Sequence, residues 1–84
     1  MNKLFTSVGW EEYIYWQTED RKILKKINNL LKDIERNGNE GLGKPEPLKH
    51  ELAGFWSRRI DEKNRLVYAL DDVTIKIVSC KGHY

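Results

Sequence analysis

Three side chains in the second half of the chain have the chemistry needed to cleave a phosphodiester bond. Glu46 can accept a proton, Arg65 carries a permanent positive charge, and His83 can donate a proton near neutral pH. RNA cleavage needs a base for the 2′-hydroxyl, an acid for the 5′-oxygen leaving group and cations for the charged transition state. We interpret this set as acid–base chemistry at a phosphate. No metal or cofactor is expected, because two histidines and one cysteine lie at positions without ligand spacing.

Glu46 lies in a segment whose backbone is strongly restricted. Two glycines and two prolines within residues 41–47 exclude a helix or a central strand. The residue before a proline is pushed out of the α region, so we expect Lys44 and Glu46 to be extended. A loop this restricted is typical of one that positions a functional residue.

Two candidate phosphate ligands are adjacent in a predicted strand and therefore point to opposite faces of the sheet: Arg58 and Arg59. If Ile60 pairs with Arg65, then Arg58 shares the face of Arg65. A bulge that shifts the register by one residue places Arg59 there instead. Either register lets two guanidinium groups converge on a phosphate. The alternative is that these arginines are exposed and paired with acidic residues of the intervening turn.

The chain ends in a histidine and a tyrosine directly after the last predicted strand. His83 and Tyr84 place an imidazole, an aromatic ring and a carboxylate within two residues. A terminal tyrosine can stack on a nucleic-acid base. The alternative is a disordered tail, because chain termini commonly fray.

Two helices are predicted in the first half. The first begins after a cap at Thr6 or Ser7 and has a stripe at helical spacing: Trp10, Tyr13, Ile14 and Gln17. The second begins after a cap at Thr18 and stops at Asn37-Gly38. Its apolar stripe follows a 3.6-residue period: Ile23, Leu24, Ile27, Leu30, Leu31 and Ile34. We expect a helical hairpin that covers one face of a sheet.

Four segments have strand character. Residues 2–6 are predicted as a short edge strand. Residues 55–60, 65–70 and 73–80 are joined by short turns, so they form antiparallel neighbours. The order β-α-α-β-β-β predicts an α+β fold, with the two-helix hairpin on one face of an antiparallel sheet. The length of 84 residues indicates one domain, residues 1–84.

Net charge, apolar runs and cysteine content indicate which partners and which cellular compartment to expect. The net charge of +2 is too small to indicate nucleic-acid binding by itself, although its excess lies in residues 41–84. No apolar run reaches membrane-spanning length, and we expect no secretion leader, because no basic, apolar and small-residue pattern follows Met1. A single cysteine, Cys80, fits a reducing cytoplasm and is expected to fill core space.

Several motifs together resemble the YoeB (Txe) toxins of the RelE/ParE superfamily: residues 43–50, 54–60, 65–68 and the terminal His83-Tyr84. The resemblance covers the whole chain and implies a RelE-like fold. It implies a ribosome-dependent endonuclease that cuts messenger RNA in the ribosomal A site and inhibits translation. It also implies an antitoxin of the YefM type, whose C-terminal segment blocks the site, and a toxin homodimer.

The resemblance also implies residue roles. Glu46 matches the general base, His83 the general acid and Arg65 the arginine that stabilises the transition state. Tyr84 matches a terminal tyrosine that orients the substrate. Basic residues that match phosphate ligands, or are plausible further contacts, are Lys49, Arg59, Arg58 and Lys44, together with the aromatic Trp56.

Two other functions are compatible with parts of the sequence. A gyrase inhibitor of the ParE kind shares the fold but has no need of Glu46, His83 and Tyr84. A small RNA- or protein-binding module would use the charged loop only for docking. Glu46→Gln keeps the shape and removes the base, so it should abolish enzymatic cleavage and spare simple binding.

Overall fold

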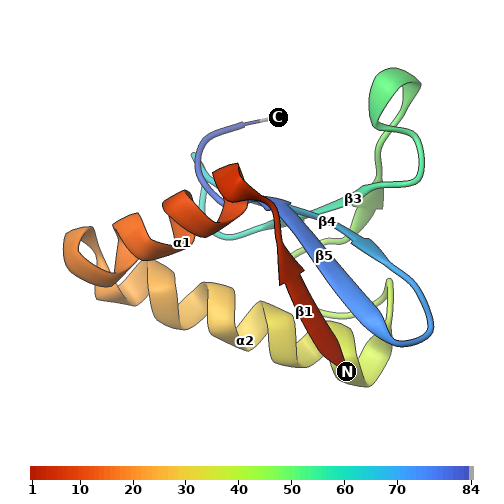
Figure 1. Cartoon of the computed structure of the whole chain (residues 1–84), viewed down its shortest axis with the longest axis horizontal. Coiled ribbons are helices and arrows are strands. Elements are labelled where there is room, and N and C mark those ends of the chain that lie inside the picture. Colours follow the sequence, from red (N-terminus) through yellow and green to blue (C-terminus); the bar gives the residue numbers. More distant parts are fainter. Residues whose placement is uncertain (84) are drawn as a thin grey trace.

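The computed structural model describes residues 1–83; Tyr84 lies outside the described residues. Two helices cover one side of a five-stranded sheet (Figure 1). The elements in chain order are β1 (Asn2–Phe5), α1 (Ser7–Glu19), α2 (Arg21–Asn37), β2 (Glu46–Pro47), the one-turn 3-10 helix η1 (His50–Leu52), β3 (Trp56–Arg59), β4 (Arg65–Leu70) and β5 (Thr74–Ser79).

The sheet has the strand order β1-β5-β4-β3-β2. The predicted α+β class, the helical hairpin and the antiparallel β3-β4-β5 run are confirmed. The sheet is mixed rather than wholly antiparallel, because β1 pairs with β5 in parallel, with Asn2 opposite Thr74. No short turn joins these two strands, so no local signal in the sequence indicates their relative direction. The short β2 occupies the opposite edge, where a proline can be accommodated.

The helix ends are formed by side-chain and glycine caps. Thr6, one of the two predicted alternatives, caps α1. Its hydroxyl oxygen accepts a hydrogen bond from the main-chain N–H of Gly9 at 3.0 Å. Asp20, not Thr18, caps α2, because its carboxylate accepts from two N–H groups of the first turn. The predicted stop at Gly38 is confirmed, and this glycine has a φ of 64°.

The predicted core stripe of α2 is confirmed, whereas that of α1 is confirmed only at Tyr13, which packs against the core. Trp10 and Ile14 are 49% and 41% exposed, and α1 buries Gly9 and Trp16 instead. A Cβ atom on Gly9 would lie 2.6 Å from the carbonyl oxygen of Ile77. The helix therefore approaches β5 along its glycine, which turns the aromatic side chain of Trp10 toward the surface.

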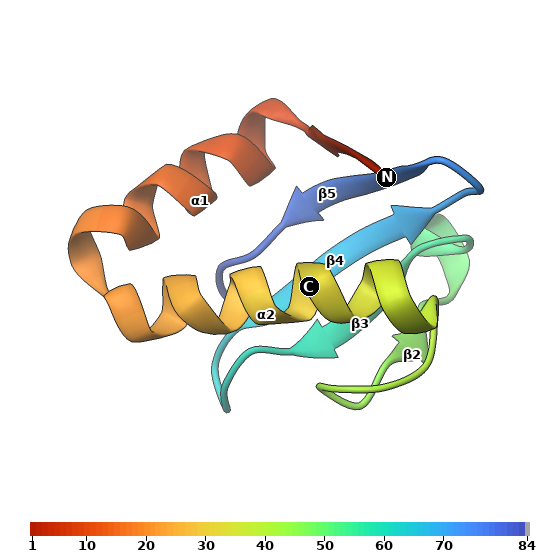
Figure 2. The same ribbon diagram turned by 90° about the horizontal axis from the view of Figure 1, so that it is seen from below.

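The buried core lies between the helices and the sheet. Figure 2 shows α2 crossing in front of β3 and β4 while α1 runs beside β5. The helix-facing residues of β3 and β4 are Trp56, Arg58, Leu66 and Tyr68. Trp56 is half-buried and packs against this core, and its contact with RNA stays a prediction. Strand alternation places on the other side of the sheet Ser57, Arg59, Arg65 and Val67.

Two sequence features can be placed in this fold. Cys80 is completely buried, as predicted, and burial together with the charge of Glu12 raises the pKa of its thiol to about 12. Neither helix is long and apolar enough to cross a membrane within the described part of the chain.

Candidate active site

The register of β3 and β4 brings two arginines together. Arg59 lies directly opposite Arg65, so Arg59, and not Arg58, shares the face of Arg65. The main-chain N–H of Arg59 donates to the carbonyl oxygen of Gly43 at 2.7 Å, and that of Arg65 donates to the carbonyl oxygen of Gly82 at 3.0 Å. The two arginines therefore form a cross-strand pair without main-chain hydrogen bonds to each other. The Cα atoms of such a pair are about 4.5 Å apart, and like charges at this position are destabilising. An anion placed between the two guanidinium groups would offset that cost.

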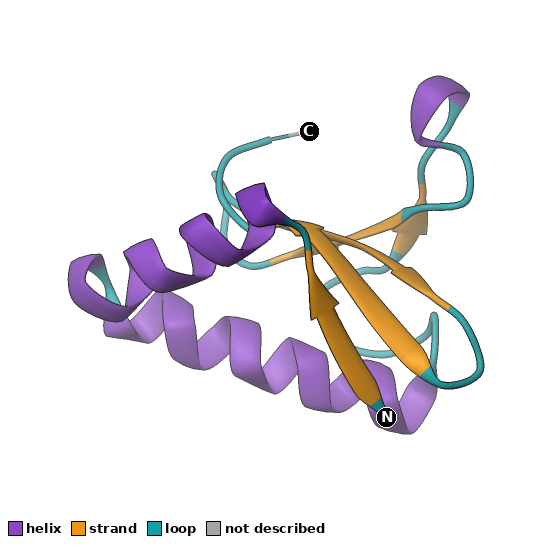
Figure 3. Ribbon diagram, in the orientation of Figure 1, coloured by secondary structure: helices purple, strands orange, loops and turns teal. Residues whose placement is uncertain are grey.

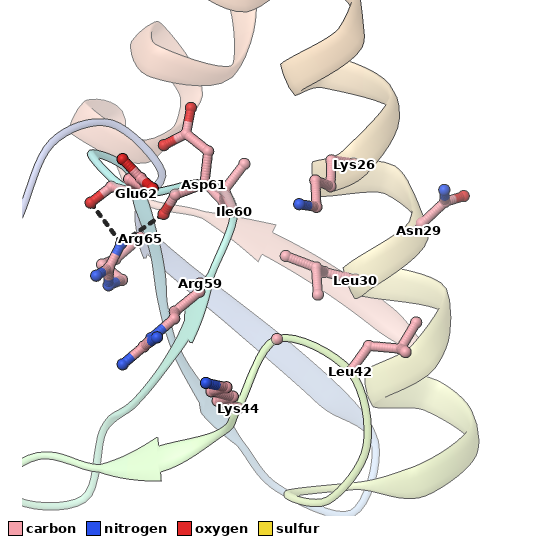
Figure 4. A pocket seen from close by; sticks show the side chains of 11 residues that line it. Lys26, Asn29, Leu30, Leu42, Lys44, Arg59, Ile60, Asp61, Glu62 and Arg65 are labelled. Atoms are coloured by element: carbon pink, nitrogen blue, oxygen red, sulfur yellow. Dashed lines mark hydrogen bonds between the residues drawn. The ribbon is translucent and has the colours of Figure 1, made fainter.

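The guanidinium group of Arg65 is held by the turn that precedes β4. Its Nη1 donates to the carbonyl oxygens of Asp61 at 2.7 Å and Glu62 at 3.3 Å (Figure 4), and to that of Asn64 at 3.1 Å. The turn therefore binds Arg65 through main-chain oxygens rather than through the carboxylates considered from sequence. Its positive charge is fixed in place without being neutralised.

Asp61 organises this turn. Its Oδ1 accepts from the N–H groups of Lys63 at 2.8 Å and Asn64 at 2.7 Å. Burial acts to raise the pKa of Asp61, but these hydrogen bonds outweigh it and hold the pKa below its usual range. The turn that holds Arg65 is therefore tied to an ionised carboxylate.

Arg58 has a structural position, which corrects the expectation that it binds substrate. Its side chain is completely buried and forms an ion pair of 2.5 Å with Asp33. It also donates to the hydroxyl of Tyr68 at 3.2 Å. Its remaining bonds go to carbonyl oxygens of the loop after α2, those of Gly38, Glu40 and Leu42. The hydrogen bond from Arg58, with one from the main chain of the loop, lowers the pKa of Asp33.

The loop anchored by Arg58 leads into β2 and Glu46. Glu46 is extended, as predicted, and lies opposite Ser57, so it shares the sheet face of Arg59 and Arg65. Lys44 is not extended, because its φ is 51°. The carbonyl oxygen of Gly43 accepts a hydrogen bond from the main-chain N–H of Arg59. Gly43 and Lys44 both have positive φ values, so the loop turns here before the chain becomes extended in β2.

A hollow of about 640 Å³ lies between α2 and the β3-β4 turn (Figure 4). Its apolar lining consists of Leu30, Leu42 and Ile60. Its lining is basic at Lys26, Lys44, Arg59 and Arg65 and acidic at Asp61 and Glu62, whose main-chain oxygens also hold Arg65. A basic surface around a concave site attracts phosphate and focuses the positive potential there.

A second hollow, of about 340 Å³, contains Glu46 and Lys49. The segment from β2 through η1 projects from the edge of the sheet (Figure 3), and it carries Lys49 and His50 on its surface. Glu46, Arg59 and Arg65 thus lie on neighbouring strands of one sheet face, but Glu46 belongs to a different hollow from the two arginines.

The tail returns to this face through Gly82. Its carbonyl oxygen accepts from Arg65, and its N–H donates to the side chain of Asn64 at 2.8 Å. His83 follows directly and is exposed. The tail is therefore docked as far as Gly82. Asn64 was not predicted as a site residue, because an asparagine in a polar turn carries no distinguishing local signal. The predicted role of Tyr84 falls outside the described residues.

Within residues 1–83, no group of three or more histidine, cysteine, aspartate and glutamate side chains is arranged to hold a metal ion.

The two-helix hairpin on a five-stranded mixed sheet matches the solved structure of a "YoeB/ParE toxin from Agrobacterium tumefaciens", with a TM-score of 0.96 at 40% identity and 100% of both chains covered. A family model described as "YoeB-like toxin of bacterial type II toxin-antitoxin system" matches residues 5–84. The chain belongs to this family of toxins.

Individual relatives are similar to this chain over all or nearly all of their length. Toxin YoeB of Escherichia coli (strain K12) is 54% identical over 84 residues, which is 100% of both chains. The structure of a YoeB dimer from Staphylococcus aureus has a TM-score of 0.95 at 55% identity, with 100% of this chain and 98% of that chain covered. A YoeB-YefM complex from the same organism has a TM-score of 0.94 at 54% identity and the same coverage.

Proposed function

We propose that this toxin is a ribosome-dependent endoribonuclease that cuts messenger RNA in the ribosomal A site and thereby stops translation. The observation that carries the proposal is the Arg59–Arg65 pair. It places two positive charges directly opposite each other on the sheet face that also carries Glu46. Such a pair is unfavourable in the empty protein and favourable around a phosphate. The carboxylate and the exposed His83 supply the proton-transfer groups.

In this mechanism Glu46 removes the proton of the 2′-hydroxyl, whose oxygen attacks the adjacent phosphorus. The bond from phosphorus to the 5′-oxygen breaks, and His83 gives that oxygen a proton. The products are a 2′,3′-cyclic phosphate and a 5′-hydroxyl end, with no metal or cofactor required. Arg65 stabilises the negative charge of the transition state, and Tyr84 orients the substrate.

Surrounding cations complete the proposed substrate contacts. Arg59 stands beside Arg65, Lys44 lines the same hollow, and Lys49 lines the neighbouring one. These positive charges hold the phosphates on either side of the cleaved bond. The ribosome presents the message, which explains how a chain with a net charge of only +2 finds its substrate.

The proposed partners follow from the family. The Staphylococcus aureus relatives were solved as a dimer and as a YoeB-YefM complex. We propose that this toxin likewise forms a homodimer and is neutralised by an antitoxin of the YefM type, whose C-terminal segment covers the basic face. The toxin acts in the cytoplasm, where messenger RNA meets the ribosome.

The test is primer extension on a defined message bound to ribosomes. Wild-type toxin is compared with Glu46→Gln, His83→Ala and the control Lys32→Ala, which removes an exposed lysine that lines neither hollow. We expect discrete cuts in the A-site codon with wild type and the control. Each site variant should be at least about 10²-fold slower. Intact message under conditions where translation is nevertheless blocked would sink the nuclease proposal and favour inhibition by binding.

A further inference from the structure

We propose that Asn64 is the positioning residue for the proton donor, acting through Gly82 to place the imidazole of His83. The chemistry assigned to His83 rests on the proposed function, whereas the contact between Asn64 and the tail is geometric. Nothing in the resemblance assigns a role to Asn64.

The first argument is that Gly82 is captured at both of its main-chain polar groups. Its N–H donates to Oδ1 of Asn64 at 2.8 Å, and its carbonyl oxygen accepts from the N–H of Arg65 at 3.0 Å. Asn64 and Arg65, the first residue of β4, therefore hold the residue directly before His83. The N–H belongs to the peptide group between residues 81 and 82 and the carbonyl to that between residues 82 and 83, so one bond restrains each of the two peptide groups that flank Gly82.

The second argument is that Asn64 is itself rigidly oriented. It is 8% exposed, and its amide nitrogen donates to both carboxylate oxygens of Asp61, at 3.1 and 3.2 Å. An ionised carboxylate only accepts hydrogen bonds, so the NH₂ of Asn64 must face Asp61 and Oδ1 must face Gly82. The hydrogen bonds that keep the pKa of Asp61 low preserve this orientation.

The third argument is that Gly82 cannot restrain His83 by itself. Its φ is 75°, and a Cβ atom placed on it would meet nothing within 4 Å. Glycine is therefore there for its backbone conformation and not for close packing, and it is the most flexible residue type. Among the described residues, the bonds from residues 64 and 65 restrain the chain directly before His83.

The fourth argument is that the same turn holds the transition-state cation. The carbonyl oxygen of Asn64 accepts from Nη1 of Arg65, while its side chain holds the tail. Asn64 therefore helps to hold both the tail that carries the proton donor, His83, and the cation, Arg65. Displacement of a reacting group by about 1 Å can cost roughly 10²-fold in rate. Loss of the Asn64 side chain should therefore slow the step in which the leaving group is protonated.

The experiment uses full-length toxin and ribosomes carrying a synthetic message in single-turnover cleavage. One message is ordinary RNA; a second replaces the 5′-bridging oxygen at the cleaved bond by sulfur, a leaving group that needs no proton. Wild type is compared with Asn64→Ala, His83→Ala, Glu46→Gln and the matched turn control Lys63→Ala. The side chain of Lys63 makes no hydrogen bond or ion pair among residues 1–83, so this control removes only an exposed neighbour of Asn64.

We expect Asn64→Ala to be about 10- to 100-fold slow on ordinary RNA and close to wild type on the sulfur-linked message, with His83→Ala showing the same selective rescue. Glu46→Gln should be slow on both messages, and Lys63→Ala normal on both. Normal cleavage of ordinary RNA by Asn64→Ala, or an equal loss on both messages, would overturn the proposal. Where Asn64→Ala does not fold, Asn64→Ser supplies a hydroxyl that can accept from Gly82 and donate to Asp61, and we expect a smaller loss with the same rescue.

A second measurement separates this inference from the proposed function. Amide exchange of Gly82 in the free toxin, followed by NMR, should be slow in wild type and at least about tenfold faster in Asn64→Ala, because its hydrogen-bond acceptor is gone. Unchanged exchange refutes the contact whatever the toxin cleaves. If exchange responds but His83→Ala is not rescued by sulfur, then the acid role of His83 is wrong, and positioning of a proton donor is overturned with it.

Discussion

Arg58 and Arg59 are sequence neighbours with opposite environments: Arg58 is completely buried against Asp33, whereas Arg59 is exposed opposite Arg65. The strand alternates its faces, so one guanidinium supports the loop that leads to Glu46 and the other points into the candidate active site. The two arginines should therefore respond differently to the same substitution.

Arg58→Met should lower the free energy of unfolding by about 3 kcal/mol, because it leaves Asp33 and the loop carbonyls without their donor. Arg59→Met should change stability by less than about 0.5 kcal/mol while reducing cleavage. Urea denaturation followed by tryptophan fluorescence measures both values. Equal destabilisation by the two variants would contradict the assignment.

Stability should fall in acid through Asp33. Its pKa is lowered in the folded protein, chiefly by the hydrogen bond from Arg58, relative to an unfolded value of about 3.9. The stabilisation is therefore complete above about pH 5 and is lost as the pH falls through the folded pKa. Urea midpoints between pH 6 and pH 2.5 should decrease less steeply for Asp33→Asn than for wild type. Parallel curves would show that Asp33 has the same pKa in both states.

Arg65→Lys tests the guanidinium geometry while keeping the charge. A lysine cannot bond to the turn carbonyls and present a planar face to phosphate at the same time. We expect cleavage on the ribosome to slow by about 10²-fold, with affinity for the ribosome nearly unchanged. Single-turnover rates at saturating toxin measure this effect. A rate within threefold of wild type would mean that charge alone is sufficient.

Gly9→Ala tests the close approach of α1 to β5. The added methyl group would lie 2.6 Å from the carbonyl oxygen of Ile77, so the helix must move outward. We expect a destabilisation of about 1–3 kcal/mol despite the higher helix propensity of alanine. Val8→Ala, at an exposed neighbouring position, is the control and should change little. Thermal melting distinguishes the two; a stabilised Gly9→Ala variant would refute the contact.

Local patterns in the sequence were sufficient for most elements and for part of the site. The 3.6-residue stripe of α2 and the alternation of β5 appear where periodicity predicted them, because burial of one face is a local property of spacing. The proline after Glu46 keeps that carboxylate extended for an equally local reason.

Other features were decided only by the tertiary structure, because they depend on contacts between distant segments. The choice of Arg59 as the partner of Arg65 depends on strand register, and the burial of Arg58 depends on Asp33, which is 25 residues away. The exposure of Trp10 follows from the approach of α1 to β5, and the docking of the tail follows from Asn64. Residue types and their spacing were enough to identify the groups that could do the chemistry, whereas packing between distant segments decided which of these groups meet.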